Sequence, residues 1–180
     1  MNIKLTKYGL PQVVIFPAVI ILAMLICLVG GLIYLPSVSV LLIDILLGII
    51  LVWTLSFFRD PHREPPNQND LLLAPADGKI ADIEIVEGNE FIGTPALRIG
   101  IFLNIFNVHL NRSPCKAKVV SIKYKRGKYK NAANPMAGKV NESNDLHMMR
   151  TDMPNDKIIV RQISGAIARR IVCKQLRDKT

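Results

Sequence analysis

Residues 13–58 contain two apolar stretches, VVIFPAVIILAMLICLVGGLIYL (13–35) and SVSVLLIDILLGIILVWTLSFF (37–58), separated only by Pro36. The first has no charged residue and, at about 1.5 Å of rise per residue, would form a helix about 34 Å long. The hydrocarbon core of a bilayer is about 30 Å thick, so each stretch is long enough to cross it. The pattern predicts a tight hairpin of two transmembrane helices. Asp44, near the start of the second stretch, is either tolerated close to a headgroup region or functional.

Positive charges flank the predicted hairpin at both of its ends. Lys4 and Lys7 precede it, and Arg59 and Arg63 follow it, whereas the turn at Pro36 carries none. Because lysine and arginine are enriched on the cytoplasmic side, we expect both ends and all that follows to lie on the cytoplasmic face of the cell (inner) membrane. Three cysteines without paired spacing suit the same reducing compartment.

The remainder of the chain has the size of one domain. Residues 59–180 carry 21 lysines and arginines against 13 acidic residues. A basic domain beside a membrane favours anionic lipid headgroups as partners. We therefore expect a membrane anchor at 1–58, a charged, proline-rich linker at 59–70 and a soluble domain at 71–180.

The soluble domain is predicted to be mainly β. Apolar and polar residues alternate in short segments bounded by turn residues, and no long helical periodicity follows residue 60. The expected strands are Leu71–Ala74, Lys79–Val86, Ala96–Ile105, Ala117–Lys125, His147–Thr151, Lys157–Ile163 and Ala166–Val172. Residues 127–144 look irregular. The fold expected is a β-sandwich or a partly open barrel.

Two short motifs could carry chemistry. In Pro75-Ala76-Asp77-Gly78, Asp77 is either part of an ordinary hairpin turn or a rigidly held carboxylate that orients a neighbouring base. In Phe102–Pro114, His109 is either hydrogen-bonded at a strand edge or acts as a base, with Arg112 three residues on to bind a phosphate or carboxylate.

Other features are less specific. Lys116–Lys130 contains seven basic residues, two tyrosines and no acid, a pattern typical of a solvated strand face. If the run binds an anion, the membrane tether favours lipid phosphate over nucleic acid, and we expect no nucleic-acid partner. The three histidines, His62, His109 and His147, are too far apart in the sequence to suggest a metal site.

Taken in order, these motifs resemble a known enzyme family. Asp77 in its Pro-Ala-Asp-Gly motif, the Phe102–Pro114 block, Asn141-Glu142 and Ile163–Cys173 together look like phosphatidylserine decarboxylase, in its short form with a membrane hairpin. The similarity runs from about Phe57 to Gln175. Any one motif alone would be weak evidence, but four in the family's order are specific.

The resemblance implies a pyruvoyl-dependent decarboxylation of phosphatidylserine to phosphatidylethanolamine. In this family a serine after a glycine becomes the pyruvoyl group while the proenzyme splits into a large β and a small α subunit. Asp77 and His109 match the family's catalytic carboxylate and histidine. Arg112, Asn141 and Glu142 would contact the substrate lipid. An ether-lipid analogue of the substrate is equally compatible with these residues.

Two departures from the family pattern shape the expectation. Family members usually have Asn-Glu-Arg where this chain has Asn141-Glu142-Ser143, and none of its eleven glycines is followed by serine. We therefore expect an incomplete chain that is inactive alone, with the pyruvoyl-forming serine and the small α subunit outside it. The alternative is a membrane-tethered β module that binds anionic lipid through Lys116–Lys130 without catalysis.

Overall fold

The computed structural model describes residues 4–66, 68, 71–134, 136–153 and 155–173. They form two compact units, Met1–Arg63 with Phe106–Val108, and Glu64–Ile105 with His109–Thr180. Each unit is described by itself.

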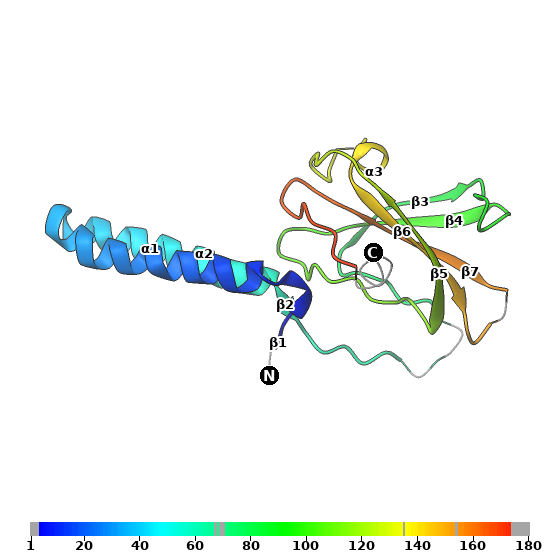
Figure 1. Cartoon of the computed structure of the whole chain (residues 1–180), viewed down its shortest axis with the longest axis horizontal. Helices are drawn as coiled ribbons and strands as arrows, with labels where there is room; N and C mark the ends of the chain where they lie inside the picture. The colour runs from blue at the N-terminus through cyan, green and yellow to red at the C-terminus, as the bar shows by residue number, and fades with distance from the viewer. Residues whose placement is uncertain (1–3, 67, 69–70, 135, 154, 174–180) are drawn as a thin grey trace. The chain divides into compact units, whose positions relative to one another are not determined.

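The first unit is a hairpin of two long apolar helices (Figure 1), α1 (Gln12–Tyr34) and α2 (Ser37–Phe57). The predicted stretches 13–35 and 37–58 are confirmed as helices within one residue at each end. A Cβ at Gly31 would come within 3.0 Å of the Val40 side chain, so the glycine permits close helix packing beside the turn. Both helices are long and apolar enough to cross a membrane.

Short backbone pairings close the open end of the hairpin. Strand β1 (Lys4–Leu5) pairs antiparallel with β2 (Arg59–Asp60), and a 3₁₀ turn, η1 (Lys7–Gly9), leads into α1. The Arg59 guanidinium donates to the carbonyl oxygens of Ser56 and Phe106, each at 2.8 Å. The start of the predicted linker is therefore tied to the helical hairpin.

The second unit begins with an antiparallel ribbon of β3 (Lys79–Val86) and β4 (Ala96–Phe102). Its register places charged residues on one face, where Arg98 pairs with Asp82 at 2.8 Å and with Glu84 at 3.0 Å. The other face is apolar and exposed; its most exposed members are Ile80, Ile83, Ile85, Leu97 and Ile99.

A three-stranded antiparallel sheet forms the rest of this unit (Figure 1), in the order β5 (Ala117–Lys125), β6 (Ser143–Arg150), β7 (Lys157–Ile163). A short helix, α3 (Ala137–Val140), precedes β6. Central strand β6 is buried on both faces although most of its residues are polar. His147 on β6 stacks against Phe91 of the β3–β4 connection, with ring centroids 4.7 Å apart, so this connection covers the sheet.

The mainly β prediction is confirmed, but several details were wrong. Leu71–Ala74 and Ala166–Val172 are not strands: Leu73 makes a single backbone hydrogen bond to Pro114, and the second segment closes local turns on itself. Strand β4 ends at Phe102 instead of Ile105, and β6 begins four residues before His147. The described strands form three small sheets and no closed barrel.

Candidate functional site

Asp77 lies immediately before β3, where the chain bends. A Cβ at the next residue, Gly78, would meet the carbonyl oxygen of Phe102 at 2.4 Å, and Gly78 has a φ of +156°. Only glycine allows the backbone to pass so close to the end of β4. The backbone directly after Asp77 thereby lies against Phe102, the first residue of the Phe102–Pro114 block, and Asp77 itself is half-buried.

Backbone hydrogen bonds join the two sequence motifs. The Leu73 N–H donates to the Pro114 carbonyl at 2.9 Å, and the Arg112 N–H donates to the Pro75 carbonyl at 2.7 Å. The two segments therefore run antiparallel: the bonded residues are two apart in each segment, 73 and 75 in one and 112 and 114 in the other. His109 and Arg112 are half-buried.

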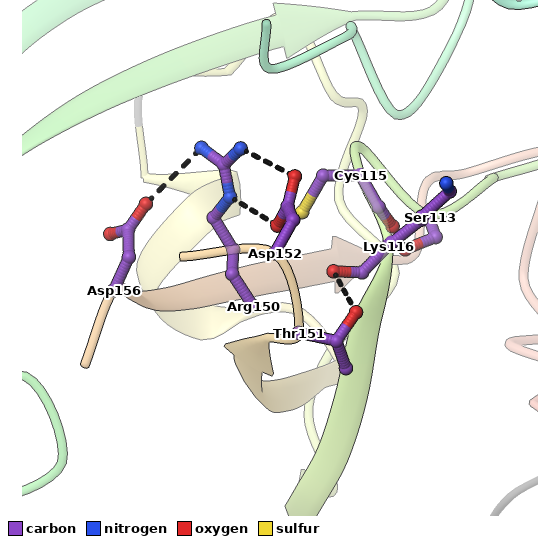
Figure 2. A network of polar contacts seen from close by, with 7 residues as sticks. All are labelled: Ser113, Cys115, Lys116, Arg150, Thr151, Asp152 and Asp156. Atoms are coloured by element: carbon purple, nitrogen blue, oxygen red, sulfur yellow. Dashed lines mark hydrogen bonds and ion pairs between the residues drawn. The ribbon is translucent and has the colours of Figure 1, made fainter. Parts of the chain in front are cut away.

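The far end of the block is tied to the turn between β6 and β7 (Figure 2). The backbone N–H and the hydroxyl of Thr151 both donate to the Lys116 carbonyl, at 3.0 and 3.2 Å, and the Ser113 hydroxyl donates to the Cys115 carbonyl at 2.6 Å. The segment that carries His109 and Arg112 is thus fixed at both of its ends.

Arg150 stiffens that turn from inside. Its buried guanidinium bonds both carboxylate oxygens of Asp152, at 3.1 and 2.9 Å, and reaches Asp156 at 3.3 Å (Figure 2). Hydrogen bonding to Asp152 raises the pKa of Arg150 and lowers that of Asp152. Burial raises the pKa of the neighbouring Cys115 thiol. These shifts favour a charged Arg150–Asp152 pair beside a neutral thiol.

Asn141 is fully buried and its amide is saturated by the backbone. Its Nδ2 donates to the carbonyls of Lys130 and Ser164, each at 2.8 Å, and its Oδ1 accepts from the Lys130 N–H at 2.9 Å. One side chain therefore joins the loop after β5 to the segment after β7.

Glu142 accepts a hydrogen bond from the Tyr129 hydroxyl and is itself buried. This bond raises the pKa of Tyr129; burial, followed by the Glu142 charge and hydrogen bond, raises that of Tyr124. Both tyrosine hydroxyls therefore stay protonated and donate hydrogen bonds to the Glu142 carboxylate.

The structure joins residues 73–75, just before Asp77, to residues 112–114 by backbone hydrogen bonds, while the contacts of Asn141 and Glu142 reach residues 128–130 and Ser164. Sequence reasoning missed the pair formed by His147 Nδ1 and the Ser121 hydroxyl, 3.0 Å apart, as well as Arg150. The uninterrupted polar run Ser143–Asn144–Asp145 was a signal, since polar residues on a central strand need partners. In the described ranges, no three His, Cys, Asp or Glu side chains gather as a metal site would require.

The family model for phosphatidylserine decarboxylase matches residues 50–180, which include every residue of this site. The chain belongs to the phosphatidylserine decarboxylase family. The resemblance inferred from the sequence motifs is therefore confirmed.

Two curated relatives of the chain carry the name of the same family. It is 41% identical over 138 residues to a phosphatidylserine decarboxylase proenzyme of Pelagibacter ubique (strain HTCC1062), covering 74% of this chain and 63% of that protein. It is 45% identical over 121 residues to the proenzyme of Desulfotalea psychrophila (strain LSv54 / DSM 12343), covering 67% and 56%. The chain spans less than two thirds of the length of these curated relatives.

Proposed function

We propose that this chain is the catalytic large-subunit part of an enzyme that decarboxylates phosphatidylserine to phosphatidylethanolamine. The observation that supports the proposal is the antiparallel pairing of residues 73–75 with 112–114, which joins the two segments that carry the Asp77 and His109 motifs. Neither motif alone distinguishes a turn or strand edge from a site, but the pairing of their segments supports a site that combines a carboxylate, an imidazole and a guanidinium.

In this proposal the His109 imidazole accepts and donates the proton of the reaction, and the Asp77 carboxylate orients the imidazole ring. Histidine is the side chain that exchanges protons near neutral pH, and a neighbouring carboxylate fixes the orientation of its ring and stabilises its charged form. The hydrogen bond from the Arg112 N–H to Pro75 fixes the backbone from which the guanidinium extends. A planar guanidinium matches two phosphate oxygens, so Arg112 would bind the lipid phosphodiester.

Asn141 and Glu142 serve the lipid side of the site in a different way. Because the Asn141 amide is spent on three backbone hydrogen bonds and Glu142 on tyrosine hydroxyls, they act on the substrate by holding residues 128–130 in place. Ser143, where the family usually has arginine, has no charge to offer a phosphate.

The electron sink of the reaction is the pyruvoyl group of this family, which accepts the electron pair left when carbon dioxide departs. The sequence does not fit this group by itself: none of the eleven glycines is followed by the serine that the family converts. We therefore assign the pyruvoyl group to a small α subunit and assign to the present residues only binding, orientation and proton transfer.

The exposed apolar face of the β3–β4 ribbon is the surface we propose for that small subunit. Its side chains are more than half exposed, with Ile85 at 79%, and such faces are ordinarily covered. The curated relatives contain polypeptide with no counterpart in the aligned region. Glu87 and Glu90, on the connection between the two strands, would disfavour an anionic membrane in the same place.

We further propose that α1 and α2 span the cell (inner) membrane, with both ends on the cytoplasmic side. The length and apolar character of the helices support a span, and Lys4, Lys7, Arg59 and Arg63 support the orientation. In this scheme residues 1–58 are the anchor, 59–70 the linker and 71–180 the decarboxylase domain.

Release of labelled carbon dioxide tests the function. The gene is expressed through its natural stop codon, and membranes are given phosphatidylserine labelled in the serine carboxyl group. We expect release of the label and its loss after treatment with hydroxylamine, which reacts with keto groups. Membranes that release no label above those of host cells without the gene would overturn the proposal.

A further inference from the structure

A basic segment on the second unit has an alternating arrangement. In residues 126–130, here called the basic loop, Gly127 and Tyr129 contact the Asn141-Glu142 segment, while Arg126, Lys128 and Lys130 are exposed. Lys128, in the middle of the loop, forms an isolated parallel β-bridge with Asn141. Three exposed cations therefore lie on a segment that is anchored through the residues between them.

The backbone of the basic loop is held at both lysines. The Lys128 N–H donates to the Val140 carbonyl at 2.8 Å, and the Lys128 carbonyl accepts from the Glu142 N–H at 3.0 Å. The N–H and carbonyl of Lys130 are both bound by the Asn141 amide. A Cβ at Gly127 would come within 2.3 Å of the Asn141 carbonyl carbon, so glycine is required for this close approach. Surface loops are ordinarily mobile, and this one is fixed.

Further cations lie close to the basic loop, in space or along the chain. The Arg169 guanidinium carbon lies 5.9 Å from the centroid of the Tyr129 ring, and exposed Lys139 follows the loop on α3. Glu142 is the acid nearest the basic loop among the contacts described, and it is buried beneath the tyrosines. The exposed charge of this surface is therefore positive.

The segments next to these cations carry exposed apolar side chains. Ile167 is 57% exposed and Met136 48% exposed, and Tyr129 presents part of its ring. The segments that carry these residues approach each other at Gly165, where a Cβ would contact the Ala132 side chain at 3.9 Å. Cations attract anionic headgroups, while aliphatic and tyrosine side chains favour the headgroup–acyl boundary. Aliphatic tips have no matching partner on a nucleic-acid phosphate backbone.

We infer that the basic loop, with Lys139, Arg169 and the apolar tips of Met136 and Ile167, docks on an anionic lipid surface. The inference rests on the proposed function insofar as a phospholipid substrate must be drawn from a membrane. It assigns a purpose to the Asn141 anchor: a loop that is already ordered loses less conformational entropy when it binds.

A tryptophan placed beside the loop reports the docking. The full chain, as the Trp53→Phe variant with Ala133→Trp, is reconstituted into vesicles of phosphatidylcholine with and without phosphatidylglycerol. Trp53, in α2, is the chain's one native tryptophan, and Ala133 is exposed. Glu87→Trp in the same background places the reporter on the β3–β4 connection as a control.

With phosphatidylglycerol we expect the Ala133→Trp emission to shift to the blue, to be quenched by brominated lipid and to revert at high salt. Lys128→Glu with Lys130→Glu should weaken docking by about fivefold or more per lysine, because each basic residue near an anionic surface contributes about 1 kcal/mol. Lys116→Glu with Lys118→Glu, an equal change of charge elsewhere in the run, should leave the shift intact.

Equal responses of the Ala133→Trp and Glu87→Trp reporters, or equal effects of the two lysine pairs, would overturn the inference. So would a response to an oligonucleotide but not to phosphatidylglycerol. The outcome is separable from the proposed function: label release without the blue shift rejects the docking surface alone, and the blue shift without label release rejects the decarboxylase alone.

Discussion

Replacing Asn141 by alanine should release the basic loop. The substitution removes three hydrogen bonds, two to Lys130 and one to the Ser164 carbonyl, from a side chain with no exposed surface. At about 1 kcal/mol for each hydrogen bond, the loss is about 3 kcal/mol. Because about 1.4 kcal/mol corresponds to a factor of ten, the local opening equilibrium should rise by about a hundredfold.

Hydrogen exchange followed by mass spectrometry measures this opening on peptides that span residues 128–131. Asn131→Ala is a matched control, because Asn131 also accepts a backbone hydrogen bond, from the Ala133 N–H at 3.0 Å, but is exposed. Exchange in the Asn141→Ala protein should accelerate at Lys130 while the Asn131→Ala protein resembles wild type. Equal protection in all three proteins would refute the reasoning that one amide holds the loop.

Three further predictions concern other parts of the second unit. Burial lowers the pKa of His147 from its ordinary 6.5, and the positive charges of Lys123 and Arg161 lower it further, while the Asp145 carboxylate partly opposes them. The folded state therefore favours the neutral ring. The unfolded chain then binds more protons below about pH 6.5, and the urea midpoint should fall as pH drops below that value; a His147→Gln protein with the same pH dependence would contradict this. Asp77→Asn should slow chain splitting in the protein expressed to its natural stop, because His109 loses its orienting carboxylate; a small subunit that appears on gels at the wild-type rate would exclude that role. Ile83→Asp with Ile85→Asp should abolish co-purification of the small subunit, whereas Arg98→Glu on the opposite face should preserve it; retention by the first variant would place the subunit elsewhere.

Periodicity predicted the parts of the fold whose burial pattern is simple. The two apolar stretches and the strands Lys79–Val86, Ala117–Lys125 and Lys157–Ile163 were expected with bounds that agree to within a residue. Each of these segments has a regular pattern of apolar residues, and periodicity alone was enough to predict its type and bounds.

Tertiary pairing decided the parts that periodicity missed. Ser143 and Asn144 were assigned to an irregular segment because residues 127–144 show little alternation, yet both residues begin β6 and pair with both neighbouring strands. Ala166–Val172 looked like a strand but has no strand to pair with among the described elements. Neither outcome is visible in a local pattern, since both depend on residues distant in the sequence.

In the candidate site, too, local patterns predicted some features and tertiary pairing decided the others. The motif residues Asp77 and His109 could be picked out by type and context, because a carboxylate held by proline and glycine and a histidine after an apolar run are chemically suggestive. The pairing of the segments that carry them could not be predicted, because it depends on hydrogen bonds between residues 73–75 and 112–114. The buried anchor formed by Asn141 was likewise invisible, since its three partners are backbone groups.

Carbon dioxide release by the His109→Ala protein, expressed to its natural stop, tests the central assignment most directly. The account predicts that label release from phosphatidylserine falls by about a hundredfold or more, the usual effect of removing a general base. His62→Ala, which removes a histidine from the first unit, should retain the wild-type rate. A His109→Ala protein that releases label as fast as wild type would contradict the account.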